Sequence, residues 1–299
     1  MVNGILNVYK EKGYTSHDVV AKLRGIVGQK KIGHTGTLDP DAEGVLPVCL
    51  GRATKVCDML TEKDKTYEAV LLLGKETDTQ DISGTVLRVG ETEGLTQEQV
   101  KDCVMSFVGE YDQIPPMYSA LKVNGKKLYE LAREGIEIER EARVITIFDL
   151  TIQPISHEEL QIVVTCSKGT YIRVLGEDIA KALGTVGHLT ALRRTATGDF
   201  SLENAMTLAD FEQLDFDARF DKLLPVDECV KALPKLQLDA QQAERIKHGQ
   251  RLNVKTCAYQ QQVLSENTQE VRLFWDEQFL GIANLESNGR LQPIKLVNL

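Results

Sequence analysis

The spacing of apolar residues along the chain predicts two amphipathic helices. Residues 15 to 28 carry apolar side chains on one side, a capping box formed by Thr15 and Asp18, and Gly28 as the stop. Residues 96 to 109 repeat this pattern, so each helix is expected to cover one face of a sheet. The residues that mark the ends of the second helix are Thr96, Gln99 and Gly109.

Three segments rich in β-branched and aromatic residues have the pattern of strands. They are residues 67 to 73, 144 to 152 and 160 to 166. Their order mixes hairpins with single helices, which is typical of an α+β domain and not of a repeated βαβ unit. We therefore expect a mixed, largely antiparallel sheet flanked by helices.

The character of the chain changes after an acidic stretch. Residues 201 to 228 hold eight acidic and two basic side chains, a local net charge of −6, and a short helix at residues 239 to 248 follows. We expect one domain over residues 1–230 and a small β-rich domain over residues 235–299. Trp275, the only tryptophan, is expected in the core of the second domain. Strands are expected there at residues 271–275 and 279–283.

Composition places the chain among folded proteins of the cytoplasm. Hydrophobic residues make up 42% and charged residues 26% of the 299 positions. The apolar stretch from Gly4 to Tyr9 is too short for a signal peptide, and no apolar run approaches the roughly 20 residues of a membrane span. The six cysteines form no C-x-x-C pair, so reduced thiols are expected in place of a zinc site or a disulfide framework. They are Cys49, Cys57, Cys103, Cys166, Cys229 and Cys257.

The net charge of −9 argues against a nucleic-acid-binding protein when it is taken alone. Most of that charge lies in residues 201 to 228, and the rest of the chain is nearly neutral. Local basic clusters therefore permit a basic groove for an anionic partner. The basic residues are Lys22, Arg24, Lys30, Lys31, Lys122, Lys126, Lys127, Arg193 and Arg194.

The densest candidate for chemistry is the glycine- and proline-rich segment from residue 31 to 47. Its composition predicts a structured loop, in which Pro40 restrains the backbone of Asp39. Asp39, Asp41 and Glu43 could form a metal-binding or phosphoryl-transfer cluster, but a Gly/Thr-rich segment precedes them where a hydrophobic strand is normal.

Two other interpretations apply to the same segment. Residues 33 to 36 could form a nucleotide-binding turn, although the second histidine of that signature is missing. A lone catalytic carboxylate at Asp39, beside a histidine and basic residues, would suit chemistry on an anionic nucleic acid. A second candidate segment, residues 166 to 173, joins a strand end to a helix and places Tyr171 and Arg173 at that boundary.

Several separate motifs together resemble the bacterial tRNA pseudouridine synthase B (TruB) family. They keep the family's order from Gly4 to Arg194. The matching segments are residues 4–16, 33–40, 51–55, 65–67, 115–122, 167–173 and 192–194. One departure is that the family's usual Lys-Pro-x-Gly reads Lys10-Glu11-Lys12-Gly13 here, which places the local turn in question.

The resemblance implies a pseudouridine synthase catalytic domain over residues 1–230 and an RNA-binding domain of the PUA type over residues 235–299. The implied substrate is the uridine at position 55 in the T-arm of tRNA, with the second domain contacting the acceptor stem. The implied reaction breaks the N-glycosidic bond and rejoins uracil through C5, without a cofactor or a metal. A cytoplasmic monomer that needs no obligate protein partner is expected.

The resemblance also implies roles for individual residues. Asp39 is the catalytic carboxylate, Arg173 pairs with it, and Tyr67 stacks on the base and could accept the C5 proton. His34 stabilises the space that the flipped base leaves. The hydroxyl and ring of Tyr171 and the side chain of Leu192 complete the expected site. The alternative is a tRNA-binding folding chaperone that uses the same groove without chemistry.

Overall fold

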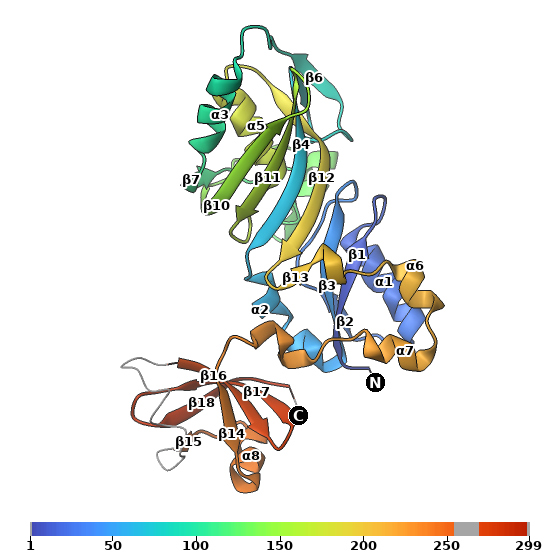
Figure 1. The fold of residues 1–299 in the computed structure, drawn as a ribbon, viewed down its shortest axis with the longest axis vertical. Helices are drawn as coiled ribbons and strands as arrows, with labels where there is room; N and C mark the ends of the chain where they lie inside the picture. Colours follow the sequence, from blue (N-terminus) through green and yellow to red (C-terminus); the bar gives the residue numbers. More distant parts are fainter. Residues whose placement is uncertain (1, 254–268, 298–299) are drawn as a thin grey trace.

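The computed structural model describes residues 2–253 and 269–297, which form two sheet-based units stacked along one long axis (Figure 1). The larger unit is built on a nine-stranded sheet and the smaller unit on a five-stranded sheet. No helix within these residues is long and apolar enough to cross a membrane. Cys257 lies outside the described residues, and the five other cysteines are free thiols.

The larger sheet is mixed and largely antiparallel, as expected. Its order is β1-β3-β12-β4-β11-β10-β7, with β2 on β3 and β13 on β12, and its parallel pair is β12 with β3. The strands are β1 (Gly4–Lys10), β2 (Ile32–His34), β3 (Glu43–Leu50), β4 (Lys65–Leu73), β7 (Gly109–Gln113), β10 (Arg143–Pro154), β11 (Glu159–Cys166), β12 (Gly187–Thr197) and β13 (Phe200–Ser201). The three strands predicted from the sequence are confirmed as β4, β10 and β11.

Helices cover the two halves of this sheet. Helix α1 (Ser16–Val27) packs with α6 (Leu208–Gln213) on the half that contains β1 and β3. Helices α3 (Gln97–Met105) and α5 (Ile172–Ala182) cover the half that contains β4, β10 and β11. The other helical segments packed on the body of this unit are η1 (Gly51–Lys55), α2 (Cys57–Thr61), η2 (Leu202–Asn204), α7 (Phe216–Asp221) and η3 (Val226–Val230).

The sequence predicted three of the four ends of helices α1 and α3. Both predicted capping boxes are present, and Gly28 ends α1 in the left-handed conformation at φ 65°. The predicted end of α3 at Gly109 is wrong, because the helix stops at Met105. Tight turns follow, with N–H groups of residues 107 and 108 donating three residues back, and Gly109 instead opens β7.

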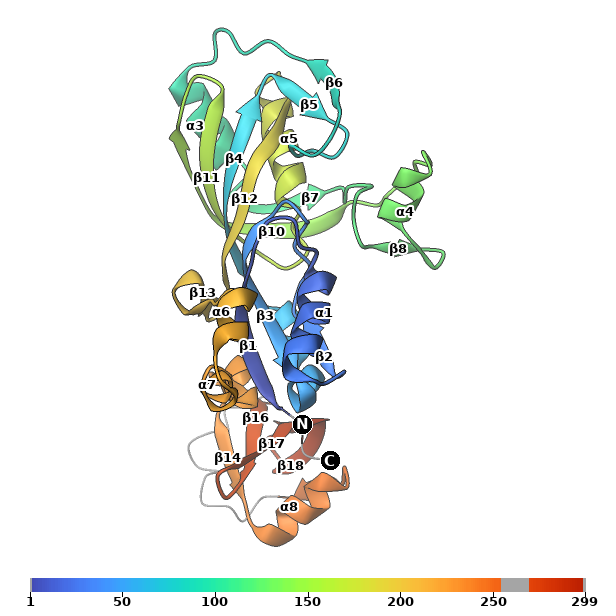
Figure 2. The same cartoon turned by 90° about the vertical axis from the view of Figure 1, so that its right-hand side faces the viewer.

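Two excursions extend from the larger unit. The hairpin of β5 (Lys75–Thr77) and β6 (Val86–Val89) lies at one end of the sheet. The strands β8 (Lys122–Val123) and β9 (Lys126–Lys127) carry α4 (Leu128–Arg133) on an arm that stands away from the body (Figure 2). These excursions were not predicted from the sequence.

The smaller unit is the expected β-rich domain. Its sheet order is β14-β16-β17-β18-β15, and α8 (Ala240–Lys247) confirms the predicted helix. The strands are β14 (Lys235–Leu238), β15 (Leu252–Asn253), β16 (Gln269–Trp275), β17 (Gln278–Leu285) and β18 (Arg290–Leu296), and β16 and β17 contain the two predicted strands. Trp275 is half-buried against the core of this domain, and the Lys247 ammonium lies 4.5 Å from its ring centroid.

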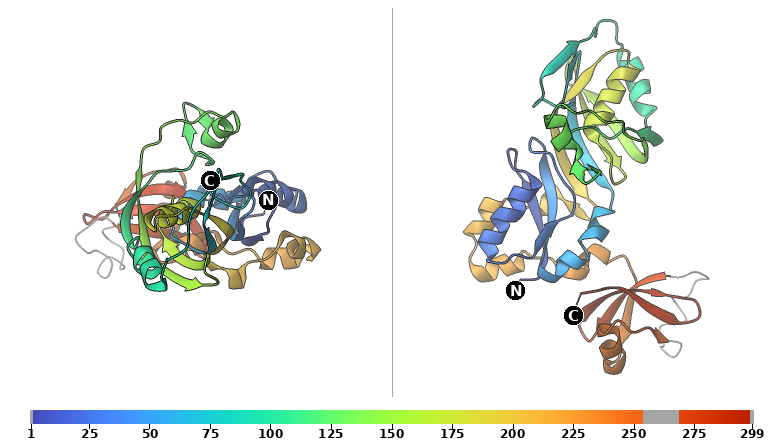
Figure 3. Two further views of the ribbon diagram at one scale, coloured as in Figure 1. Left: turned by 90° about the horizontal axis from the view of Figure 1, so that it is seen from above. Right: turned by 180° about the vertical axis from the view of Figure 1, so that it is seen from behind.

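The two units share a hydrophobic contact where the second sheet meets the base of the first (Figure 3). Phe279 and Ile282 from β17 lie in one buried cluster with Val45 from β3. Beside this cluster, Lys55 Nζ donates to the carbonyl of Leu296 at 2.9 Å. Burial of apolar surface between the units favours a fixed orientation of the small domain on the large one.

Candidate active site

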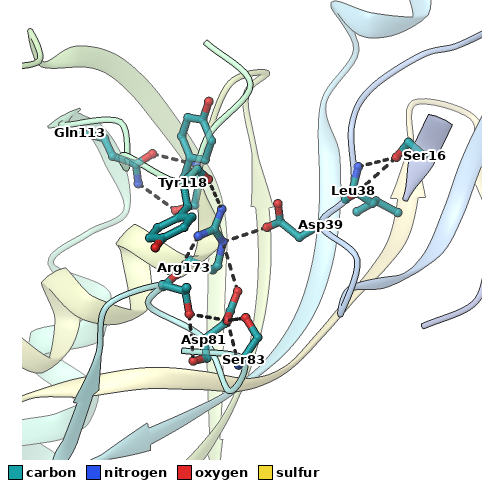
Figure 4. Close-up of polar contacts among 10 residues, drawn as sticks. Ser16, Leu38, Asp39, Asp81, Ser83, Gln113, Tyr118 and Arg173 are labelled. Atoms are coloured by element: carbon teal, nitrogen blue, oxygen red, sulfur yellow. Dashed lines mark hydrogen bonds and ion pairs between the residues drawn. The ribbon is translucent and has the colours of Figure 1, made fainter. Parts of the chain in front are cut away.

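Asp39 lies in the loop between β2 and β3, and hydrogen bonds to the residues before and after it fix its backbone. The Ser16 hydroxyl accepts from the Leu38 N–H at 2.9 Å and lies 3.3 Å from the Leu38 carbonyl (Figure 4). On the other side, the Gly13 N–H donates to the Pro40 carbonyl at 2.9 Å. Leu38 itself is buried in the core, so the carboxylate next to it has a defined position.

Arg173 reaches Asp39 from the first turn of α5. Its Nε donates to Asp39 Oδ2 at 2.8 Å, and its two terminal nitrogens donate to the carbonyls of Thr79 (2.7 Å) and Tyr118 (2.8 Å) (Figure 4). The Arg173 side chain is 5% exposed, whereas that of Asp39 is 37% exposed. The guanidinium is therefore fixed by three directed hydrogen bonds, and the carboxylate remains accessible to a ligand.

A second carboxylate, which the sequence did not single out, lies near the same nitrogen of Arg173. Asp81 Oδ2 is 3.7 Å from Arg173 Nε. Its Oδ1 accepts from the Thr79 hydroxyl at 2.7 Å and from the N–H of Ser83 at 3.0 Å, so Asp81 is fixed within its own turn. The polar run from Asp78 to Gly84 is a turn signal, but nothing local in it indicates that the turn meets α5.

The start of α5 is clamped by a buried glutamine. Gln113 Oε1 accepts from the Tyr171 N–H at 2.8 Å, and Gln113 Nε2 donates to the Tyr171 carbonyl at 3.1 Å and to the Tyr111 hydroxyl at 2.6 Å. Tyr171 is the residue that precedes the helix, and Arg173 is its second residue. The predicted junction at residues 166 to 173 is thus confirmed, and its position depends on Gln113. Burial raises the pKa of Tyr171 above its ordinary value.

Three of the six predicted site residues line one small cavity of about 50 Å³. Asp39, Arg173 and Leu192 lie in its wall, together with the unpredicted Asp81 and Lys12. Leu192 comes from β12, next to β4 in the sheet, so the cavity combines residues from distant parts of the chain. This arrangement places a fixed carboxylate beside an apolar wall.

Tyr67 lies in β4 and is 8% exposed. It belongs to the same hydrophobic cluster as Leu38 and Leu192, behind the cavity wall. Burial raises the pKa of its phenol, so the neutral phenol is favoured and the phenolate is disfavoured. Tyr67 is not among the residues that line the cavity.

His34 lies in β2 and not among the residues that line the cavity. Its Nδ1 accepts from the Gly36 N–H at 3.4 Å, and its ring packs edge-on to His17 with centroids 5.3 Å apart. Burial lowers the pKa of His34 to about 4, so the imidazole is neutral at pH 7. The structure therefore separates His34 from the Asp39–Arg173 pair.

Two cations support the loop from within the protein. Arg194 is 1% exposed and donates to the carbonyls of Val45 (2.7 Å) and Gly36 (3.3 Å). Lys10 is fully buried, and its Nζ donates to the carbonyls of Pro40 (3.2 Å) and Glu11 (3.1 Å). The turn that contains Glu11 in place of the family's proline is therefore tied to the loop that carries the candidate carboxylate.

The structure corrects one expectation about basic residues. Arg194 is buried and cannot contribute to an exposed basic groove. Arg193 donates to Glu43 at 2.8 Å and is therefore already paired. Glu43 is consequently directed to Arg193 while Asp39 is directed to Arg173, so these two carboxylates of the segment do not share one ligand position.

Comparisons with protein families and with solved structures agree with this geometry. Residues 24–172 match the family model for the N-terminal domain of TruB family pseudouridylate synthases. Residues 173–231 match the model for the tRNA pseudouridylate synthase B C-terminal domain, and residues 234–297 match that for the C-terminal region of pseudouridine synthase II TruB. The matched residues include the loop that carries Asp39, the cavity residues other than Lys12, and the small β domain.

Curated relatives resemble the chain over its whole length. A protein named tRNA pseudouridine synthase B from Dechloromonas aromatica is 45% identical over 100% of this chain and 96% of its own. A protein of the same name from Lachnoclostridium phytofermentans is 47% identical over 99% of both chains. The relative of that name from Psychrobacter cryohalolentis is 42% identical over 100% of this chain and 94% of its own.

Solved structures share the fold. A crystal structure of a Cbf5–Nop10–Gar1 complex aligns with a TM-score of 0.73 at 24% identity over 98% of this chain and 84% of that chain. A structure of an H/ACA RNP bound to a substrate RNA containing 2′-deoxyuridine aligns with a TM-score of 0.72 at 22% identity over the same shares. At these identities the likeness concerns the fold. Together with the family models and the full-length relatives, the findings show that the chain belongs to the TruB family of pseudouridylate synthases.

Proposed function

We propose that this chain isomerises the uridine at position 55 in the T-arm of tRNA to pseudouridine, with Asp39 as the catalytic carboxylate. The observation that carries the proposal is the 2.8 Å hydrogen bond between Asp39 and Arg173 at the cavity. The guanidinium of Arg173 is buried and makes three hydrogen bonds in all. Curated relatives named tRNA pseudouridine synthase B support the choice of substrate.

The reaction breaks the bond between C1′ and N1 and forms a bond between C1′ and C5, while C5 loses a proton and N1 gains one. Attack on C1′, removal of a ribose proton and addition to the base all need a carboxylate oxygen against the nucleoside. Arg173 occupies Asp39 Oδ2 and so orients the side chain for this contact. Leu192 supplies an apolar surface against the uracil.

Tyr67 and Tyr171 act as neutral phenols in this proposal. Burial raises the pKa of both, which disfavours their ionised forms. We propose that the ring of Tyr67, which lies behind the cavity wall, contacts the base when the nucleotide is bound, and that Tyr171 holds the site at the start of α5. The proton that leaves C5 is then transferred to water or to Asp39 more readily than to a buried phenol.

The target base must leave its stack to reach the cavity, at a cost of about a few kcal/mol. His34 lies outside the cavity lining, which supports a contact with the RNA around the cavity over a contact with the reacting uracil. Its imidazole is neutral at pH 7, which favours stacking or hydrogen bonding over ion pairing. We infer that His34 stabilises the space that the flipped base vacates.

The small β-rich domain, which is PUA-like, is proposed to contact the acceptor stem. It lies at the opposite end of the long axis from β5 and β6 (Figure 1), and its packing against the larger unit fixes their relative orientation. Exposed basic side chains at the end of α8, Arg245 and Arg251 among them, suit contact with phosphates. This arrangement would extend the interface beyond the T-arm.

The test is release of tritium from unmodified tRNA that carries C5-tritiated uridine. The parent protein is expected to release one equivalent from an otherwise normal transcript. A transcript in which uridine 55 is replaced by cytidine should release none, whereas replacement of uridine 54 should preserve release. Release that persists without uridine 55 would contradict the assigned position, and absence of release from every transcript would contradict the activity.

A further inference from the structure

The cavity is lined by more negative than positive charge. Five of its lining residues are charged: Lys12, Asp39, Asp41, Asp81 and Arg173. Arg173 is already engaged by two of the carboxylates, Asp39 at 2.8 Å and Asp81 at 3.7 Å. Across residues 2–253 and 269–297, no carboxylate oxygen lies within 4.0 Å of Lys12 Nζ. Lys12 is thus the cavity cation whose charge is not used inside the protein.

The backbone around Lys12 is fixed to the loop that carries Asp39. The Gly13 N–H donates to the Pro40 carbonyl at 2.9 Å, and Lys10 Nζ donates to the same carbonyl at 3.2 Å. Gly13 adopts φ 85°, a conformation that a residue with a side chain rarely adopts. Lys10 and Gly13 therefore both bond to Pro40, the residue that follows Asp39. The side chain of Lys12, between them, is exposed.

A nucleotide whose base enters this cavity brings its flanking phosphates to the rim. Three carboxylates in the lining would repel a phosphate, and an exposed ammonium on an anchored turn would offset that repulsion. Contacts of lysine with phosphates position a nucleic acid without reading its bases. On the premise that tRNA is the substrate, we propose that Lys12 binds a phosphodiester that flanks the target uridine.

This proposal predicts a specific salt dependence. Each phosphate that a protein neutralises contributes about 0.7 to 0.9 to the slope of log affinity against log salt concentration. Lys12→Gln should make that slope less steep by about this amount and weaken tRNA binding by up to about fivefold at moderate salt. A small loss of stability that leaves the variant folded would not remove a phosphate contact, so it would leave the slope unchanged.

The experiment measures binding of unmodified tRNA from about 50 to 200 mM salt. Every protein carries Asp39→Asn, so that turnover does not disturb the equilibrium. Lys12→Arg should retain the parent slope. Lys101→Gln, at an exposed position on α3 away from the cavity, should change neither slope nor affinity. A melting temperature for each variant checks that it is folded.

The outcomes separate this inference from the proposed function. If the Asp39→Asn parent binds tRNA and Lys12→Gln lowers the affinity and the slope, the phosphate contact is supported. If the parent binds and Lys12→Gln has the parent slope, the inference is overturned and the proposed function stands. If the protein without Asp39→Asn neither binds nor turns over tRNA, the proposed function fails and this inference fails with it.

Discussion

Arg173 donates its Nε–H to Oδ2 of Asp39 across 2.8 Å, although 134 positions separate the two residues in the chain. The pair joins the loop between β2 and β3 to the start of α5, so the two halves of the larger unit meet at the carboxylate (Figure 4). Asp39 is oriented by a group that is itself nearly inaccessible to solvent. Catalysis should therefore depend on the residues that hold this carboxylate in place.

Replacement of Arg173 by lysine should impair catalysis more than binding. Lysine keeps the charge but lacks the planar fork, so it cannot contact Asp39 and the carbonyls of Thr79 and Tyr118 together. Because a misplaced catalytic group costs on the order of 100-fold in rate, we expect Arg173→Lys to lower kcat by about that factor. Single-turnover tritium release and tRNA binding measure the two effects separately. A variant that turns over as fast as the parent would argue against the orienting role.

Gln113 should matter for catalysis without contacting the substrate. Gln113→Leu leaves the N–H of Tyr171 without its partner and removes one of the two donors to the Tyr171 carbonyl, which destabilises the start of α5 by about 1–3 kcal/mol. Since Arg173 follows two residues later, we expect kcat to fall roughly 10- to 100-fold with little change in tRNA affinity. Gln153→Leu, at an exposed position on β10, is the matched control. An equal loss in both variants would attribute the effect to the added apolar surface.

Lys10 should make the stability of the protein depend on alkaline pH. Burial lowers its pKa from 10.5 to about 8 in the folded protein, so between these values the unfolded chain binds more protons. The free energy of unfolding contributed by Lys10 therefore rises as the pH rises from about 8 towards 10.5. A neutral amine retains two N–H bonds, enough for the carbonyls of Glu11 and Pro40.

The measurement for Lys10 is the difference in unfolding free energy between the parent and Lys10→Met at pH 7.5, 8.5 and 9.5. Lys65, whose pKa burial also lowers to about 8, is present in both proteins and cancels from the difference. The parent should gain stability relative to the variant across this series. A constant difference would show that Lys10 has the same pKa in the folded and unfolded chains.

Elements whose signals are local could be predicted from the sequence. The capping boxes at Thr15 and Thr96 and the alternating burial of β4 depend on neighbouring residues, and each is present. Strand β12 was not predicted because it carries polar residues that are nonetheless buried, His188 and Arg194. Its pairing with both β3 and β4 is a long-range property that no short window of sequence contains.

The residues of the candidate site also fall into those that the sequence indicates and those that only the tertiary structure brings in. Asp39, Arg173 and Leu192 were found through motifs, and the structure brings these three together. The carbonyls of Thr79 and Tyr118 were missed because any residue supplies a backbone carbonyl, so the sequence at those positions carries no signal for the contact. Asp81, Gln113 and Lys10 were missed because their roles depend on the tertiary contacts that surround Arg173 and the loop of Asp39.

The most direct test of the central claim compares the parent protein with Asp39→Asn on unmodified tRNA that carries C5-tritiated uridine, in excess chelator. The substitution removes the charge but little volume, so the variant should bind tRNA and release no tritium, while the parent releases it without a free metal ion. Asp149→Asn, at an exposed position on β10, should behave like the parent. Release by Asp39→Asn at the rate of the parent would contradict the account.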